Sequence, residues 1–257
     1  MRRTLTGDYA MFTQGRARRR SSSAASPMPV GDASPPPRLH YAVGDVHGRS
    51  DLLHQALRDI DDDRAGEPAV AVFLGDYVDR GPDSRAVIDR LMSDDAPGLT
   101  KVCLMGNHEA MMLQALAQGG PAMATWLQNG GETTCRSYLG QFPPAHLSWL
   151  GALPLTYETE HHLFVHAGIR PDVALSEQRQ TDLLWIRRAF LDAREDFGKH
   201  VVHGHSPEIG PDLSPFRTNL DGLAWRTGRL RIGVFDIGRP GGAMRIMEAR
   251  LGQAQAS

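Results

Sequence analysis

The feature that most constrains this chain is one pattern that occurs three times between residues 38 and 118. A short apolar run ends in glycine and polar residues, and an amphipathic stretch follows; the runs are LHYAVGDVHG, AVAVFLGDYVDRG and LTKVCLMGNHE. Such runs predict strands covered on both faces. Apolar residues recur at helical spacing after the first run, at Leu52, Leu53, Ala56, Leu57 and Ile60. The order β-α-β-α-β-α predicts an α/β layered fold with polar side chains gathered at strand ends.

The second half of the chain is richer in predicted strands. HHLFVHAGIRP and KHVVHGHSP are apolar runs with histidine beside glycine, and residues 121–160 before them predict helix and loop. FRTNLDGLAW, RLRIGVFDI and AMRIMEARL, between residues 216 and 250, predict antiparallel strands joined by glycine turns. We therefore expect two sheets packed face to face with helices outside. This domain would span residues 38–250, with a flexible C-terminus over 251–257.

Residues 1–37 differ from the rest in composition. Six arginines stand there against two aspartates, so this segment carries about +4 charges and the remainder about −6. Its Arg-, Ser- and Pro-rich run cannot bury enough apolar surface to offset the entropy of ordering, which predicts a disordered N-terminal extension. The basic start is followed by no apolar segment typical of a secretory signal, so we expect a cytoplasmic protein.

Composition disfavours several classes of protein. The sequence has no run of 18 apolar residues, so we expect no membrane partner. A net charge of −2 gives no reason to expect a nucleic-acid partner. Cys103 and Cys135 form no C-x-x-C, which disfavours a disulfide framework or a thiolate zinc site. The eleven histidines, several beside Asp, Asn or Gly, indicate where chemistry should be sought.

Five predicted strand ends carry the same kinds of polar residues. They are Asp45-Val46-His47, Asp76 to Arg80, Asn107-His108-Glu109, His166, and His203-Gly204-His205. Asp and His at positions i and i+2 just beyond a strand can point to the same side. Carboxylate, imidazole and amide ligands without thiolate suit Mn²⁺, Fe or Zn²⁺. The pattern therefore predicts a metal site built from loops at the strand ends.

The motifs GDVHG, GDYVDRG and GNHE occur in this order, followed by HAG at 166–168 and GHSP at 204–207. Together they resemble the signature of the PPP-type serine/threonine phosphatases, in their bacterial and phage branch, within the calcineurin-like metallophosphoesterase superfamily. The resemblance covers roughly residues 38–237. It implies a metallophosphoesterase catalytic domain, a β-sandwich flanked by helices, with a dinuclear centre at the carboxyl ends of strands. The two divalent metals would be Mn²⁺, with Fe or Zn²⁺ as alternatives.

The resemblance also implies a role for each motif residue. The metal ligands would be Asp45, His47, Asp76, Asn107, His166 and His205. Asp76 would bridge both ions. The residues that bind the substrate phosphate would be Arg80, Arg187 and Asn107. His108 would be the general acid, with Asp79 holding its imidazole, and a metal-bridging hydroxide would attack phosphorus directly.

Several positions remain open between two interpretations. His203 shares a strand face with His205, but His205 directly precedes Ser-Pro and takes the family position. Arg188 lies beside Arg187 and competes for the phosphate-binding role. Six other histidines are expected to be surface or core residues: His40, His54, His146, His161, His162 and His200.

Two further features concern the surroundings of the site. Glu109 is expected to support the site rather than bind metal. NLDGLAW at 219–225 departs from the Asp-Thr-Gly turn of bacterial relatives, with Leu223 in place of the glycine. This departure allows a reshaped loop near the second metal, although it removes none of the ligands.

Three functions are compatible with these residues. The leading interpretation is a metal-dependent hydrolase of phosphoserine and phosphothreonine, whose partners are phosphorylated proteins or peptides. The alternative is a symmetrical diadenosine-tetraphosphate hydrolase or another phosphoester hydrolase of the superfamily. That group usually has VARG in its second motif, so Asp79 in VDRG favours the phosphatase. A catalytically inactive phosphoprotein-binding module is disfavoured because Asp76, Asn107 and His108 are all present.

Overall fold

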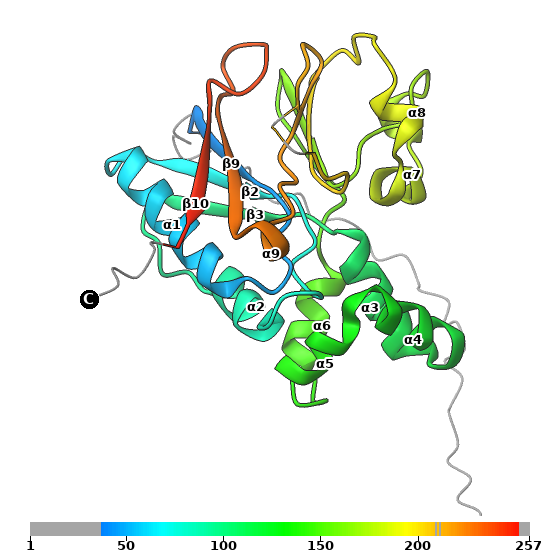
Figure 1. Ribbon diagram of the computed structural model, residues 1–257. Coiled ribbons are helices and arrows are strands. Elements are labelled where there is room, and N and C mark those ends of the chain that lie inside the picture. Colours follow the sequence, from blue (N-terminus) through cyan, green and yellow to red (C-terminus); the bar gives the residue numbers. More distant parts are fainter. Residues whose placement is uncertain (1–36, 209, 211, 252–257) are drawn as a thin grey trace, which may run out of the picture. The chain divides into compact units, whose positions relative to one another are not determined.

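The computed structural model describes residues 37–208, 210 and 212–251 (Figure 1). The predicted disordered extension and flexible C-terminus lie outside the described residues, apart from Pro37 and Leu251. None of the helices in the described ranges is long and apolar enough to cross a membrane.

One layer is a five-stranded sheet with the order β10-β9-β1-β2-β3. The threefold βα pattern is confirmed, in the elements β1 (Leu39–Val43), α1 (Ser50–Arg64), β2 (Ala69–Phe73), α2 (Ser84–Met92), β3 (Leu99–Cys103) and α3 (Asn107–Gln118). Leu39 pairs with Ala69, and Ala69 pairs with Leu99, so the three parallel strands start and end level. The antiparallel hairpin of β9 (Arg229–Asp236) and β10 (Arg245–Arg250) extends the sheet beside β1.

The second sheet has the order β4-β5-β6-β8-β7. Its strands are β4 (Thr156–Glu158), β5 (His162–Val165), β6 (His200–His203), β7 (Asp212–Leu213) and β8 (Arg217–Asn219). The prediction that the segment 216–225 pairs with the next strand along the chain was wrong. β8 pairs parallel with β6, and the chain then passes through α9 (Ala224–Thr227) before it enters β9 of the other sheet. The short helix takes the place of the tight turn that antiparallel pairing would need.

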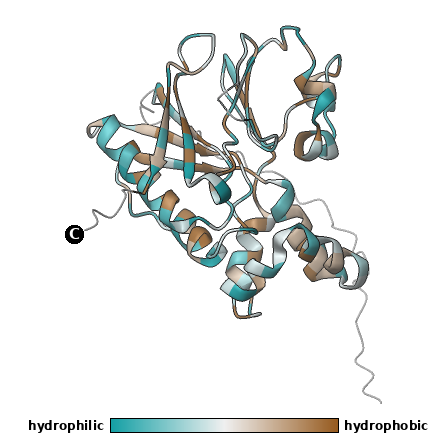
Figure 2. Cartoon of the chain, viewed as in Figure 1, coloured by the Kyte–Doolittle hydropathy of each residue, from teal (hydrophilic) through white to brown (hydrophobic). Residues whose placement is uncertain are grey.

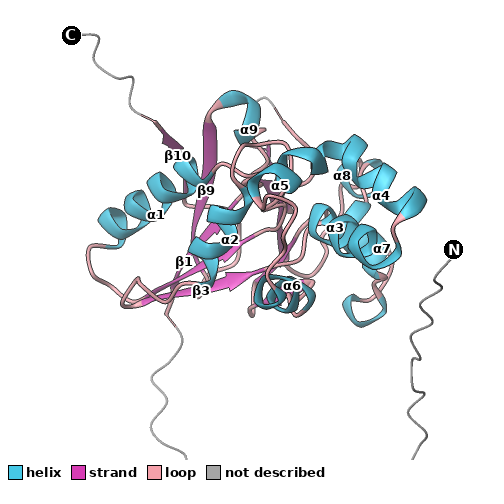
Figure 3. Cartoon of the chain, turned by 90° about the horizontal axis from the view of Figure 1, so that it is seen from below, coloured by secondary structure: helices cyan, strands magenta, loops and turns pink. Residues whose placement is uncertain are grey.

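The two sheets pack face to face with helices outside, as predicted. The residues buried between the sheets are Ala42, Val70, Val72, Leu74, Leu104, Phe164, Val202, Leu220 and Phe235. Helices α1 and α2 cover the first sheet, and the predicted apolar stripe of α1 is buried there (Figure 3). Helices α7 (Gln180–Trp185) and α8 (Arg188–Leu191) lie beside the second sheet (Figure 1). Figure 2 shows apolar residues along the strands of both layers.

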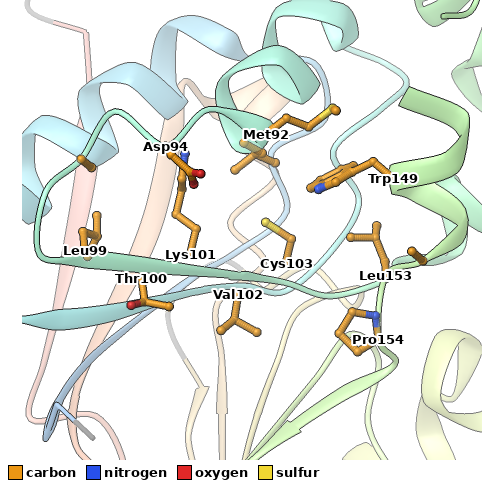
Figure 4. Close-up of a pocket in the computed structure, with 13 residues that line it drawn as sticks. Met92, Asp94, Leu99, Thr100, Lys101, Val102, Cys103, Trp149, Leu153 and Pro154 are labelled. Atoms are coloured by element: carbon orange, nitrogen blue, oxygen red, sulfur yellow. The ribbon is translucent and has the colours of Figure 1, made fainter. Parts of the chain in front are cut away.

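The remaining helices are α4 (Gly120–Trp126), the kinked turn η1 (Leu127–Gly131), α5 (Glu132–Ser137), α6 (Pro144–Gly151) and the 3₁₀ turn η2 (Leu175–Glu177). A cavity of about 660 Å³ lies along the edge strand β3, against Trp149 and Leu153 (Figure 4). Lys101 and Cys103 also line it, but none of the predicted site residues does. The cavity therefore belongs to the outer edge of the first sheet rather than to the polar strand ends.

Candidate active site

All predicted site residues except Arg187 lie in loops at the carboxyl ends of five strands, or begin α3 directly after such a loop. In chain order they are Asp45, His47, Asp76, Asp79, Arg80, Asn107, His108, His166 and His205. All of them except Arg80 are buried. Parallel strands bring their carboxyl ends to one edge of a sheet, so these loops converge.

Glycine lets the loops after β2 and β3 touch. A Cβ on Gly106 would lie 2.3 Å from the backbone nitrogen of Asp76, and Gly75 has a φ of 104°. Asp76 and His47 have φ values of 53° and 45°, a conformation that is unfavourable for residues with a side chain. Such strained residues concentrate at functional sites, where surrounding contacts hold them in place.

Two groups of ligand atoms form around Asp76. His47, Asp76 and His108 offer ligand atoms that all lie within 4.8 Å of one another, and Asp76, His166 and His205 do the same. Asp76 belongs to both triads, which is the position that a bridging ligand requires. Burial opposes the ionisation of Asp76, but the surrounding histidines, His166 foremost, lower its pKa when they carry a proton.

Hydrogen bonds to backbone carbonyls orient two of the imidazoles. His47 Nδ1 donates to Val78 O at 2.8 Å, and His166 Nδ1 donates to Leu74 O at 2.9 Å. Burial lowers the pKa of His47 to about 3 and also lowers that of His166. Both rings are therefore neutral near pH 7, and each directs the lone pair of Nε2 into the site, as metal-binding histidines do.

The second triad contains lone pairs that a cation would satisfy. Burial and neighbouring His166 lower the pKa of His205 to about 2, and its Nε2 is buried without a hydrogen-bond partner. Nε2 of His166 faces the side-chain oxygen of Asn107 at 2.8 Å. Nδ1 of His166 already donates, so Nε2 of the neutral ring is an acceptor. It therefore faces a second acceptor, the Asn107 oxygen, unless the amide group is flipped.

Buried carboxylates add negative charge at the same place. Burial, Asp221 and Asp76 raise the pKa of Asp45 well above its usual range. Burial and Asp76 likewise raise the pKa of Asp221 to about 6. Asp45 belongs to neither triad, and its oxygens accept the backbone N–H of His205 at 3.2 and 3.3 Å. Carboxylates buried together need compensating cations, so this donor set fits divalent metal ions.

Sequence reasoning did not identify Asp221 as part of the site. Asp221 is buried and follows the last residue of β8 by two positions, as Asp45 follows β1. The rule that found the other loops would have found Asp221 if the segment 216–225 had not been assigned to an antiparallel strand. Leu223 has a φ of 53°, so the loop keeps a left-handed residue at the position expected to be glycine.

Glu109 supports the site without joining either triad. Its buried carboxylate accepts the backbone N–H groups of Asp76, Tyr77 and Val78 at 2.8, 2.7 and 3.2 Å. It also accepts the N–H of Gly106 at 2.9 Å, just before α3 begins. One side chain thus fixes the loop after β2 against the loop after β3.

His108 and Asp79 form a buried pair beside the first triad. His108 Nδ1 lies 2.6 Å from Asp79 Oδ2. Burial lowers the pKa of His108, but Asp76 and Asp79 outweigh it, so the net shift is upward. Arg80 donates to His47 Nε2 at 2.9 Å, and its other terminal nitrogen lies 3.0 Å from His108 Nε2, so its guanidinium lies in the middle of the site.

Arg187 reaches the site from the side of the second sheet. Its guanidinium donates to the hydroxyl of Ser206 at 3.2 Å, next to His205. Its positive charge contributes to the lowered pKa values of His166 and His205. The structure therefore gives Arg187 a place at the site, whereas Arg188 begins the short helix α8.

The structure separates His205 from His203. His203 is buried against the ring of Phe190, with a distance of 5.0 Å between ring centroids, and belongs to neither triad. The six histidines that were expected to have no site role also lie outside both triads.

The chain resembles known proteins in sequence. The sequence pattern of the calcineurin-like phosphoesterase family matches residues 41–229. A serine/threonine-protein phosphatase 1 from Salmonella typhimurium is 29% identical over 180 residues, which is 65% of this chain and 78% of that protein. A symmetrical bis(5'-nucleosyl)-tetraphosphatase from Janthinobacterium is 30% identical over 183 residues, 67% of this chain. The match covers only 58% of that tetraphosphatase.

Solved structures share the fold at low sequence identity. A protein serine/threonine phosphatase from Saccharomyces cerevisiae superimposes with a TM-score of 0.58 and 16% identity, covering 88% of this chain and 84% of that chain. A metallophosphoesterase from Sphaerobacter thermophilus gives 0.51 and 17%, covering 83% and 88%. With the family match over most of its length, the chain belongs to the calcineurin-like phosphoesterase family.

Proposed function

We propose that this phosphoesterase hydrolyses phosphoserine and phosphothreonine in proteins or peptides. The observation that carries the proposal is the 2.6 Å contact between His108 and Asp79. A serine or threonine alkoxide is a poor leaving group and needs a proton as it departs, which a positioned imidazole supplies. A nucleotide phosphate leaves more easily without one. The pair is therefore more useful to a phosphomonoesterase than to a tetraphosphatase.

The family uses two divalent metal ions, and the donor set described above fits them. We infer that His47, Asp76 and Asp45 hold one ion, and that Asp76, Asn107, His166 and His205 hold the other. Divalent ions at such a site lower the pKa of a bound water and neutralise charge on phosphate oxygens. Mn²⁺ is the ion we favour, with Fe or Zn²⁺ as alternatives.

The protein's own side chains would bind and orient the substrate. Arg80 and Arg187 approach the site from opposite sheets, and each planar guanidinium can donate to two phosphate oxygens. His108 would donate the proton on Nε2 to the leaving oxygen, while Asp79 keeps Nδ1–H in place. Asp79 thereby fixes which nitrogen of the ring faces the substrate.

A second candidate is symmetrical hydrolysis of dinucleoside tetraphosphates, which the 30% identity to the Janthinobacterium enzyme favours. The same metal ligands would serve it. The two functions separate in one experiment, in which the purified chain with Mn²⁺ is assayed on a phosphoserine peptide and on diadenosine tetraphosphate. We expect the higher kcat/KM on the peptide. A higher value on the dinucleotide would replace the proposal with the second candidate.

A further inference from the structure

The helical segment 120–137 contacts Asp79 and Arg80 although it carries none of the motif residues. It comprises α4, η1 and α5, and it contains an Asn-Gly-Gly turn at 129–131. Two of its side chains, Trp126 and Thr134, are completely buried, and so is Asp79. Polar atoms buried this deeply need hydrogen-bond partners. Each close contact between these side chains can therefore be assigned a donor and an acceptor.

Three donors converge on the carboxylate of Asp79. Trp126 Nε1 donates to Oδ1 and Oδ2 at 3.0 and 2.9 Å. The hydroxyl of Thr134 donates to Oδ1 at 2.7 Å, and His108 Nδ1 lies 2.6 Å from Oδ2. An indole N–H can only donate, so Asp79 is an acceptor on both oxygens. These donors stabilise the ionised carboxylate, which places the proton between Asp79 and His108 on Nδ1 of the imidazole.

Thr134 holds the backbone of Asp79 as well as its side chain. A hydroxyl has one proton and two lone pairs, and Thr134 gives its proton to Asp79 Oδ1. Its oxygen must therefore accept from its other neighbours, the backbone N–H of Asp79 at 2.8 Å and the hydroxyl of Ser84 at 2.9 Å. Every hydrogen-bonding position of Thr134 Oγ1 is used at this one site.

The same segment holds Arg80. Asp79 and Arg80 have φ values of 72° and 68°, so surrounding contacts must keep both in the left-handed region. The backbone N–H of Arg80 donates to Gly130 O at 3.2 Å. A Cβ on Gly130 would lie 2.9 Å from Arg80 Cγ, and one on Gly131 would lie 2.6 Å from the Trp126 ring. The two glycines let the turn approach both side chains.

We propose that segment 120–137 is the positioning element of the catalytic pair. Trp126 and Thr134 fix Asp79, which keeps Nε2 of His108 directed at the substrate, and the turn at Gly130 fixes Arg80. Trp126 and Thr134 are completely buried and both contact Asp79, so they would act through Asp79. The inference rests on the proposed hydrolysis of phosphomonoesters, in which a positioned acid matters for an alkoxide leaving group.

The kinetic test compares leaving groups. Thr134→Val removes the hydroxyl at nearly constant volume, and Trp126→Phe removes the indole donor. We expect each to lower kcat on a phosphoserine peptide about tenfold, the effect of losing one hydrogen bond to a charged group. Turnover of p-nitrophenyl phosphate should change less than twofold, because its leaving group departs without a proton. KM and bound Mn²⁺ should stay at wild-type values.

Two control variants separate positioning from loss of structure. Thr134→Ser keeps a hydroxyl and should restore the phosphoserine rate to near the wild-type value. Trp149→Phe changes a tryptophan of the same core that packs on Tyr77, with ring centroids 6.1 Å apart, and should change neither rate. Equal slowing of both substrates by Thr134→Val, or loss of metal from it, would overturn the positioning role.

A spectroscopic test does not depend on turnover. In protein loaded with diamagnetic Zn²⁺, the short hydrogen bond of His108 Nδ1–H should give a low-field proton resonance. We expect this resonance in wild type and in Thr134→Ser, and a clear upfield shift in Thr134→Val. An unchanged resonance in Thr134→Val and Trp126→Phe would overturn the inference. A shifted resonance in a protein that hydrolyses no phosphoserine would support it while the proposed function fails.

Discussion

Buried histidines lie at both ends of the strands, and the two groups differ in their partners. The carboxyl-end histidines, in loops after the strands or at the start of α3, are His47, His108, His166 and His205. The amino-end histidines, at or near the first residues of β1, β5 and β6, are His40, His162 and His200. Burial lowers the pKa of all three amino-end histidines, as it does for three of the carboxyl-end ones. Burial and pKa therefore do not distinguish the groups.

Carboxylates and backbone strain do distinguish them. His40 is hydrogen-bonded to the hydroxyl of Tyr157 at 3.1 Å, and His200 to the hydroxyl of Thr218 at 2.8 Å, both neutral partners. The carboxyl-end histidines instead surround Asp76. The residues other than glycine with positive φ at that end are His47, Asp76, Asp79, Arg80, His205 and Leu223. Among the described residues, histidines form a candidate metal site where an acidic residue and a strained loop accompany them.

Replacing the shared carboxylate should have the largest effect. Asp76→Ala removes the one ligand common to both triads, so we expect loss of both metal ions and activity below detection. Elemental analysis and a p-nitrophenyl phosphate assay measure the two losses. Chelation of wild type should reproduce the loss of activity, and added Mn²⁺ should restore it. Full turnover by protein shown to be free of metal would contradict this account of the site.

The next effect concerns His108. If His108 protonates the leaving oxygen, His108→Asn should slow phosphoserine hydrolysis ~10²–10⁴-fold and p-nitrophenyl phosphate much less. Asp79→Asn should act in the same direction, because the imidazole loses the carboxylate that orients it. Metal content should remain at the wild-type level in both variants. Since His108 also lies in the first triad, loss of one metal from His108→Asn would make it a ligand instead.

How far the sequence predicts this arrangement depends on local signals. The ends of the three predicted strands are marked in the sequence itself, because Gly44, Gly75 and Gly106 stand between each apolar run and its polar residues. The contacts of Trp126 and Thr134 with Asp79 carry no such signal, since they join positions 47 and 55 residues apart in the chain. The placement of β8 beside β6 is equally non-local. Tertiary packing decides these features, so periodicity and spacing cannot predict them.

His203 and His205 test the distinction between core and site within one strand end. His205→Ala should remove about one of the two metal ions and lower activity more than tenfold, because it empties a ligand position of the second triad. His203→Ala should keep both ions and mainly lower stability, since its ring packs on Phe190. Metal analysis of the two variants side by side measures the difference. The reverse result would assign the ligand role to His203.

The amino-end histidines should make stability depend on pH. Burial lowers the pKa of His40 and His200 to about 4 in the folded protein, below the usual value of 6.5. The unfolded chain therefore binds protons first as the pH falls, and stability is lost between about pH 6.5 and 4. Each histidine would contribute a loss of up to about 2 kcal/mol between pH 7 and 5.

Urea unfolding at saturating metal measures this loss. The double variant His40→Gln, His200→Gln has no proton to gain at these positions, so its unfolding free energy should fall less than that of wild type over the same pH range. Turnover at pH 7 should be unaffected, because neither residue lies at the site. An equal fall in both proteins would show that His40 and His200 do not contribute to the pH dependence.

The smallest expected effect concerns backbone strain in the loops at the carboxyl ends of the strands, and it tests whether all of that strain contributes to the site. Leu223 and Leu139 have nearly the same φ, 53° and 51°, but Leu139 is 82% exposed and belongs to no site loop. Holding a residue with a side chain in the left-handed region costs about 1–2 kcal/mol of stability. Glycine removes this cost, but it lowers stability by about 0.5–1 kcal/mol because it increases the conformational entropy of the unfolded chain. Leu223→Gly and Leu139→Gly should therefore each stabilise the protein by about 0.5–1 kcal/mol, a Tm rise of about 1–4 °C.

Leu139→Gly isolates the backbone contribution, because its side chain makes little packing to lose. Leu223 donates its backbone N–H to Asp221 Oδ1 at 2.9 Å, a contact that glycine can keep. We therefore expect kcat of Leu223→Gly to stay within about twofold of wild type, which would place its strain outside the mechanism. A rise in Tm together with a tenfold fall in kcat would instead show that the strained leucine positions Asp221 beside Asp45. In that case backbone strain in the 219–225 loop would contribute to activity, as we expect for the strain in the motif loops.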